Sequence, residues 1–234
     1  DRIPPMRSRQ AAGGVYMNLP HGIVLNIEGY WKRMDNMYEY SGIEILYPDI
    51  EKWEHDLMRG KGRSYGAEVE LAWRTKDTDI SAYYTLSWTE RLIKGIWHDW
   101  YPARNDNRNK FALHATHRFS RRFDRYLAWN YHTGDRSTVP TQIIGGEVYY
   151  TSPYNYKMPD YHRLDLGFNF RKTTRRGNES IWNLTLYNAY CRMNPMFTML
   201  DHYKKSSSSD EYKTTFKTLA AIPVIPSFNY TLRF

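Results

Sequence analysis

The residues that could do catalytic chemistry show no spacing that would bring them together. His114 and His117 lie three apart, so in a strand they point to opposite faces and cannot share a metal ion. The other histidines show no ligand spacing with cysteine or aspartate; they are His21, His55, His98, His132, His162 and His202. No motif predicts a nucleophile elbow, a phosphate-binding glycine loop or a metalloprotease helix. We therefore expect no enzyme, metal or cofactor, although a Ser–His pair assembled by folding stays open.

A set of charged residues stands on the polar side of segments in which polar and apolar residues alternate. Successive side chains of a strand point to opposite faces, so these charges would all face away from the apolar side. In a membrane barrel they would face the lumen, either as a solvated wall with cross-strand pairs or as a solute path. The set is Glu28, Glu68, Glu70, Arg118, Arg163, Asp165 and Arg233.

Two long connections carry aromatic residues beside hydrogen-bonding groups. Loops on a rigid scaffold often carry recognition, so these are candidates for binding sugars, peptides or a metal chelate. Equally, their Tyr and Trp residues could mark an interfacial aromatic belt. The candidates are Trp97, His98, Trp100, Tyr101, Arg104, Tyr149, Tyr150 and Tyr154.

The elements that position these residues are predicted to be strands. Alternation is clearest at 164–170, where Leu164, Leu166, Phe168 and Phe170 are interleaved with polar residues and a glycine. Similar segments recur with about the ten-residue length of a tilted transmembrane strand. The nine predicted strands are 11–19, 23–32, 68–74, 80–89, 111–118, 127–132, 164–170, 182–186 and 228–234.

The predicted connections alternate between short and long. Short turns fall at 20–22, 76–79, 120–123 and 174–178, and long loops at about 35–61, 93–107, 136–159 and 193–213. Short periplasmic turns and long external loops are typical of an outer-membrane barrel. Aromatic residues near strand ends (Trp31, Trp73, Trp88, Trp182) suit an interfacial girdle and favour the barrel over a soluble β-sandwich or surface adhesin.

Composition agrees with this fold class. Aromatic residues make up 16% of the chain, yet 25% is charged and the mean hydropathy is −0.75. No run approaches the ~18 apolar residues of a membrane helix. The net charge of +8 comes from scattered residues, which favours anionic lipid or lipopolysaccharide over nucleic acid as a partner. The single Cys191 forbids an internal disulfide, and the residues from Asp1 onward show no basic and apolar pattern of a signal peptide.

Several segments resemble the barrel of TonB-dependent outer-membrane receptors of the Bacteroidetes type. The resemblance covers essentially residues 1–234, although no single motif in it is diagnostic. The segments are Leu25–Met34, Tyr65–Glu68, Tyr161–Leu166, Trp182–Tyr190 with Asn194-Pro195, and Ile225–Phe234.

The resemblance implies an all-β, antiparallel up-and-down transmembrane β-barrel of about 22 strands, closed inside by a plug. Nine strands are an odd number, so we expect 1–234 to be the carboxy-terminal portion of one barrel domain, with plug and earlier strands outside it. Residues 1–10 would then end an earlier external loop.

The last strand also resembles the signal read by the barrel-assembly machinery. Phe234, Leu232 and Ser227 match, and Tyr230 continues the alternation, while Asn229 stands where that signal usually has glycine. The implied function is TonB-coupled import of a siderophore, cofactor, oligosaccharide or peptide across the bacterial outer membrane. A surface lipoprotein partner is compatible but not implied. Alternatives are a passive porin or adhesin-like barrel and a barrel-embedded hydrolase.

Overall fold

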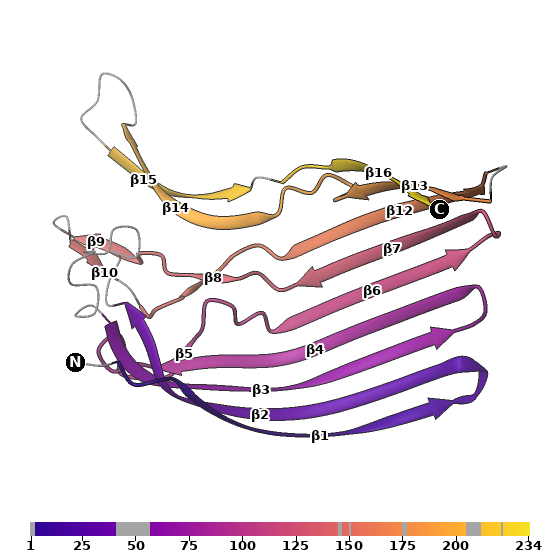
Figure 1. Ribbon diagram of the computed structural model, residues 1–234. Helices are drawn as coiled ribbons and strands as arrows, with labels where there is room; N and C mark the ends of the chain where they lie inside the picture. The colour runs from indigo at the N-terminus through magenta and orange to yellow at the C-terminus, as the bar shows by residue number, and fades with distance from the viewer. Residues whose placement is uncertain are drawn as a thin grey trace.

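The computed structural model describes residues 3–40, 57–144, 147–149, 151–174, 177–204, 212–220 and 222–234. Nine long antiparallel strands form the main sheet in up-and-down order (Figure 1). They are β1 (Arg7–Leu19), β2 (Ile23–Tyr40), β3 (Leu57–Arg74), β4 (Thr78–Leu92), β6 (Asn109–Arg118), β7 (Phe123–His132), β12 (Tyr161–Thr173), β13 (Glu179–Tyr187) and β16 (Ile225–Arg233).

The remaining strands are short pairs or hairpins within the long connections. β5 (Tyr101–Pro102) pairs with β4. The other pairs are β8 (Arg136–Ser137) with β11 (Tyr156–Lys157), β9 (Gln142–Ile144) with β10 (Glu147–Tyr149), and β14 (Pro195–Lys204) with β15 (Tyr212–Ala220). The one helical element in the described ranges is a 3₁₀ turn, η1 (Pro20–Gly22). No helix of the described residues is long and apolar enough to cross a membrane.

The all-β, antiparallel, up-and-down prediction is confirmed. Each of the nine predicted segments lies in a strand of the main sheet, apart from Phe234, which directly follows β16. The strands that pair are those expected to be neighbours. In the described residues the sheet is not closed, because β1 and β16 lie at its two edges. Closure into a barrel and the total strand number therefore stay predictions.

Several predicted boundaries at the loop end were wrong. β1 already begins at Arg7, and β2 and β3 extend into the predicted loop 35–61, as far as Tyr40 and back to Leu57. Near Asp35 the one-sided alternation is lost, and the register shifts between Asp35 and Met37. Asn36 occupies the bulge with φ 57°, a backbone conformation that asparagine tolerates. The predicted loop 193–213 contains β14 and the start of β15, so it is largely a hairpin.

All short turns of the main sheet lie at one end of the strands and all long connections at the other (Figure 1). The first short turn depends on glycine. Gly22 has φ +76°, and a Cβ there would lie 2.2 Å from the carbonyl oxygen of Arg74. Trp73 covers the same turn, its indole N–H donating to the carbonyl oxygen of His21 at 3.2 Å. We call the two ends the turn end and the loop end.

The register gives the sheet one apolar face. Residues directly paired in an antiparallel sheet point to the same side. Along one row across the sheet, the apolar face carries Val15, Ile27, Val69, Tyr84, Phe111, Tyr131 and His162. Leu164, Leu166, Phe168 and Phe170 of β12 lie on this face too.

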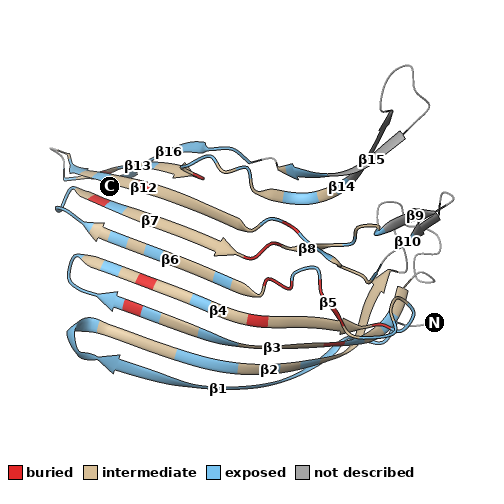
Figure 2. Cartoon of the chain, turned by 180° about the vertical axis from the view of Figure 1, so that it is seen from behind, coloured by how far each residue is buried: buried red, intermediate tan, exposed pale blue. Residues whose placement is uncertain are grey.

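The apolar face is open rather than packed. Val15 is 56% exposed, Leu71 48% and Phe228 60%. The largest fully buried side chains, Tyr101, Ile93 and Asn188, belong instead to connections at the loop end. Figure 2 shows few buried residues along the strands themselves. Among the described residues no second layer covers the sheet, which is unlike a soluble β-sandwich.

Candidate functional site

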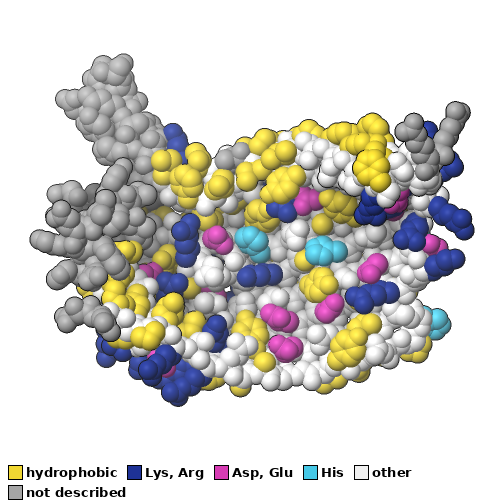
Figure 3. Space-filling model, in the orientation of Figure 1, with side chains coloured by type: hydrophobic (Ala, Val, Ile, Leu, Met, Phe, Trp, Pro, Cys, Tyr) yellow, Lys and Arg dark blue, Asp and Glu magenta, His cyan; other side chains and the backbone are white. Residues whose placement is uncertain are grey.

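The opposite, polar face carries the predicted lumen residues. Glu28 pairs directly with Glu68, and this row continues through Thr85, Lys110 and His132 to Tyr161. By the two-residue period, Glu70, Arg118, Arg163, Asp165 and Arg233 share that face. Figure 3 shows charged side chains spread over it. The structure thus brings all seven to one side of the sheet; that this side is a lumen stays a prediction.

Three carboxylates on the polar face have no partner among the described residues. Glu28 and Glu68 are exposed and face each other. Glu70 lies two residues further along β3 on the same face and is half-buried. No ion pair or hydrogen bond of their side chains occurs within the described ranges. Like charges opposite each other in a sheet destabilise it unless water screens them. This part of the face is therefore built to stay wet.

At the loop end of the polar face, Arg163 is held in a tight network. Its guanidinium pairs with the Asp165 carboxylate, with Nε–Oδ1 at 2.9 Å. It also donates to the hydroxyls of Tyr161 at 2.7 Å and Tyr187 at 2.6 Å. Asp165 in turn accepts the backbone N–H of buried Asn188 at 2.9 Å. The Arg163 charge is compensated by Asp165 inside the chain, so the network orients the β12–β13 end rather than offering a free charge.

Arg118 and Arg233 lie near the turn end. Arg118 is exposed, and within the described ranges its side chain has no acidic partner. Arg233 donates to Glu179 Oε2 at 3.2 Å across β13 and β16. These two residues are far from the Arg163 network, so the seven charges form a face rather than a single site.

The predicted loop candidates divide into a stacked pair, of which Tyr101 is buried and Tyr154 half-buried, and a more accessible group. Tyr101 and Tyr154 come from different connections, yet their rings stack with centroids 6.3 Å apart. Both hydroxyls donate to the carboxylate of Glu39, and Arg91 pairs with the same group at 3.0 Å. We name Glu39, Arg91, Tyr101 and Tyr154 the loop-end clamp.

Burial decides what the loop-end clamp can do. The Tyr101 residue is 1% exposed and the Glu39 side chain 11%. Burial, and then the charge of Glu39, raise the pKa of both tyrosines well above the usual value. The hydroxyls therefore stay neutral donors to Glu39. The expectation that Tyr101 contacts a ligand is not supported, because its ring and hydroxyl are enclosed.

Sequence reasoning missed Glu39 and Arg91. Glu39 fell inside the predicted loop 35–61, since the alternation of β2 is lost before it. Arg91 lies on the extended end of β4, beyond the predicted boundary at Thr89. The one available signal was a lone carboxylate between two tyrosines, Tyr38-Glu39-Tyr40, which has no distinctive meaning alone.

The other candidates are half-buried or exposed at the loop end. Trp100 lies under the guanidinium of Arg63, 4.3 Å from ring centroid to Cζ. Trp97 and His98 touch each other with centroids 4.9 Å apart. Arg104 is exposed, and Tyr149 is 51% exposed on β10. Tyr150 lies outside the described residues. Ligand contact by this group stays a prediction.

A second polar layer ties the same two connections to the strand ends. Asp106 has a side chain 1% exposed; it accepts the Thr89 N–H at 2.8 Å and pairs with Arg108 at 3.1 Å. The amide of buried Asn107 donates to the carbonyl oxygen of Thr133 at 2.8 Å and to Asp135 Oδ1 at 2.6 Å. The loops are therefore pinned to the scaffold, as a preformed recognition surface requires.

Asp160 completes this layer where β12 begins. Tyr131 and the Gly134 N–H donate to it at 2.7 and 3.0 Å, and Lys157 lies at 2.8 Å. Burial alone would raise the pKa of Asp160, but these donors outweigh it and lower the pKa to about 2. The carboxylate is thus ionised at any physiological pH.

The spacing of His114 and His117 predicted that they point to opposite faces, and the structure confirms it. His114 and His117 both lie in β6 and on opposite faces; His117 Nδ1 lies 2.8 Å from Thr78 Oγ1. Among the described residues no group of His, Cys, Asp and Glu could hold a metal ion. His55 lies outside the described residues.

The predicted assembly signal occupies the edge strand. Ser227 pairs with Thr185 on the polar face, whereas Tyr230 and Leu232 belong to the apolar face. The Tyr230 ring packs against Trp182 with centroids 5.0 Å apart. Phe234 follows the strand and is 98% exposed. The strand is accessible as such a signal requires; recognition by the assembly machinery stays a prediction.

No protein-family model matches this chain, and no curated protein matches its sequence. The resemblance to TonB-dependent receptors therefore depends on the sequence segments alone, and the function that it implies is a proposal.

Proposed function

We propose that this chain forms part of the wall of an outer-membrane β-barrel and that the barrel is a TonB-dependent active transporter. The observation that carries the first half is the exposed apolar face. A single sheet with one apolar and one polar, charged face is stable only where the apolar side meets a non-aqueous medium. The bilayer would supply that medium.

Two rows of aromatic residues bound the apolar face and support a membrane position. The row nearer the loop end contains Trp31, Tyr65, Trp88 and Tyr131. The row nearer the turn end contains Trp73, Phe123, Phe170, Trp182 and Tyr230. Aromatic girdles at both interfaces are typical of membrane barrels.

Both aromatic rows shift along the strands by the same number of residues, as expected if the strands are tilted in the membrane. From β3 to β7, both rows move four residues toward the turn end. Four residues are about 14 Å, and the three strand spacings between β3 and β7 together are also about 14 Å, which gives a slope of roughly 45°. Membrane barrels have strand tilts of about 35–45°.

The separation of the rows also suits a bilayer. Tyr65 and Trp73 are eight residues apart on β3, as are Phe123 and Tyr131 on β7. Eight residues span about 27 Å of strand, or about 19 Å across a membrane at this slope. The apolar band of outer-membrane barrels is about 25 Å tall.

The open edges support further strands in the assembled protein. Unpaired backbone groups in hydrocarbon cost several kcal/mol each, so β1 and β16 need partners in a bilayer. In the family that the sequence resembles, about 22 strands close the barrel around a plug. TonB pulls that plug with energy from the proton-motive force. The wet polar face would then line the lumen, and the loops held to the strand ends would form the surface that captures the transported solute.

The test of transport uses uptake by cells. A strain lacking the protein should lose uptake of a ferric siderophore, cobalamin, an oligosaccharide or a peptide supplied as labelled probe. A protonophore should stop the same uptake in the parent strain. Uptake that continues with the protonophore would favour the passive porin alternative. Lipid or peptide cleavage by purified protein would favour the hydrolase.

A further inference from the structure

Basic side chains gather at the turn end of the sheet. Among the described residues Lys76, Arg118, Arg121, Arg122, Arg125 and Lys172 have no acidic partner there. The acidic residues nearby are mostly engaged: Asp79 with Arg74, Asp124 with Arg171, and Glu179 with Arg233. The turn end therefore has an excess of uncompensated positive charge.

Two of these cations lie on the apolar face itself. Arg125 pairs with His117 and Phe168, which places its side chain among apolar-face residues. Lys172 pairs with Ser180 one pleat beyond Phe170. An unpaired cation on a lipid-facing surface is costly unless it reaches the interface or meets an anion.

The conformation of Arg125 points to the interface. Its Cα is level with that of His117, but its guanidinium lies over the ring of Phe119, 4.8 Å from the centroid. Phe119 is two residues nearer the turn end than His117. The side chain thus extends along the sheet toward the turn, as arginines do when they snorkel to a membrane surface.

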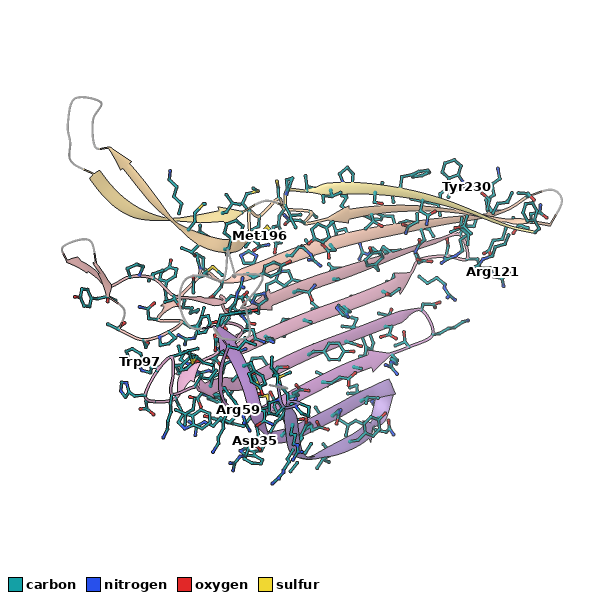
Figure 4. All side chains as sticks on the ribbon, turned by 60° about the vertical axis from the view of Figure 1, so that its left-hand side comes forward. Asp35, Arg59, Trp97, Arg121, Met196 and Tyr230 are labelled. Carbon is teal, nitrogen blue, oxygen red and sulfur yellow. The ribbon has the colours of Figure 1, made fainter. Side chains whose placement is uncertain are left out.

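A shallow apolar groove lies beside these cations. Phe170, Trp182, Leu184 and Phe228 line it, and its volume is about 370 Å³. The stacked rings of Phe119, Phe123 and Phe170 connect it to Arg125. Lys172 lies on the turn side of the groove, and Arg121 and Tyr230 lie at the same end of the sheet (Figure 4).

We infer that this groove and its cations bind an anionic phospholipid, with an acyl chain against the aromatic groove and the phosphate at Arg125 and Lys172. Resting on the proposed membrane position, the inference adds a lipid preference to the leaflet that meets the short turns. Charge complementarity selects this occupant, since the apolar part takes hydrocarbon and the cations take a phosphodiester.

The experiment measures lipid preference near Trp182. The folded protein is reconstituted in phosphatidylcholine bilayers containing brominated phosphatidylglycerol or brominated phosphatidylcholine. The part of the tryptophan fluorescence quenching that disappears in the Trp182→Phe variant reports the lipid beside the groove. We expect phosphatidylglycerol to be preferred several-fold, at about fivefold per basic residue near the surface. The double variant Arg125→Gln/Lys172→Gln should lose most of that preference.

Two controls keep the result specific. Arg118→Gln removes one unpaired charge at the same end but from the polar face, and should retain the preference. Arg125→Lys retains the charge and should also retain it, which separates binding from misfolding. Two results would overturn the lipid site while leaving the membrane position intact. One is equal quenching by the two brominated lipids; the other is a loss of phosphatidylglycerol preference in Arg118→Gln as large as in the double variant. No quenching by either brominated lipid would overturn both.

Discussion

At the scale of single residues, Glu39 is the side chain on which the loop end depends. It is the shared acceptor for Tyr101, Tyr154 and Arg91, three groups from three segments of the chain. Removing one member of a buried charged set leaves the others desolvated without compensation. The loop end is therefore expected to be sensitive at this one position.

We predict that Glu39→Gln loosens the connections 93–108 and 133–160. The free energy of unfolding should fall by roughly 2–3 kcal/mol, because Arg91 loses its anion and one tyrosine its acceptor. Limited proteolysis and amide hydrogen exchange of the two connections measure the effect. Glu90→Gln is the matched control: it breaks the more exposed Arg63–Glu90 pair and should cost about 1 kcal/mol or less. Equal effects of the two substitutions would contradict a special role for Glu39.

The clamp also predicts an alkaline transition. Burial and Glu39 raise the pKa of Tyr101 and Tyr154 in the folded chain, whereas unfolded tyrosine titrates near 10. The stabilisation is therefore fully present below pH ~10 and is lost as the pH rises toward the folded pKa values. Absorbance titration of the parent should show a late tyrosine fraction that Tyr101→Phe/Tyr154→Phe lacks. Matching titrations of the two proteins, apart from total amplitude, would refute the enclosure of these hydroxyls.

At the scale of elements, the sequence predicted the strands well and the loop end poorly. One-sided alternation, as in Leu164 to Phe170, reports a face that meets an apolar medium, so it marks the segments facing that medium. Beyond it, residues 35–40 of β2 are half-buried beside the connections of the loop end, and they carry no periodic signal. Tyr101 was recognised as a candidate, but its partner Glu39 lies 62 positions away and only folding joins them.

The hairpin β14–β15 is expected to be dispensable for the sheet. β13 and β16 pair directly over nine residue pairs, so the connection between them need not carry the register. Replacing residues 197–219 by a short Gly/Ser linker retains Ile222, whose carbonyl accepts from Asn188. The free energy of unfolding should change by about 0.5 kcal/mol or less, since loop length has a weak effect. A denaturant titration checks this, and loss of the cooperative transition would show that the hairpin supports the sheet.

At the scale of the whole molecule, the two faces of one sheet should respond oppositely to charge. Leu164→Arg lies near the middle of the apolar face and should cost about 2–4 kcal/mol, whereas Phe170→Arg at its border should cost about 1 kcal/mol or less. His114→Arg is the control for Leu164→Arg: it is exposed on the wet face, pairs with the uncharged Ser81 and Ala128, and should be nearly neutral.

The measurement is reversible unfolding from lipid bilayers, repeated for these three variants. Depth dependence on one face and tolerance on the other follow only if lipid bathes the apolar side, because a water-soluble partner sheet has no depth profile along the strands. A penalty for Phe170→Arg as large as that for Leu164→Arg would contradict the bilayer, and with it the position of both aromatic rows. A large penalty for His114→Arg would instead mean that the polar face is packed, leaving no wet interior for a transported solute.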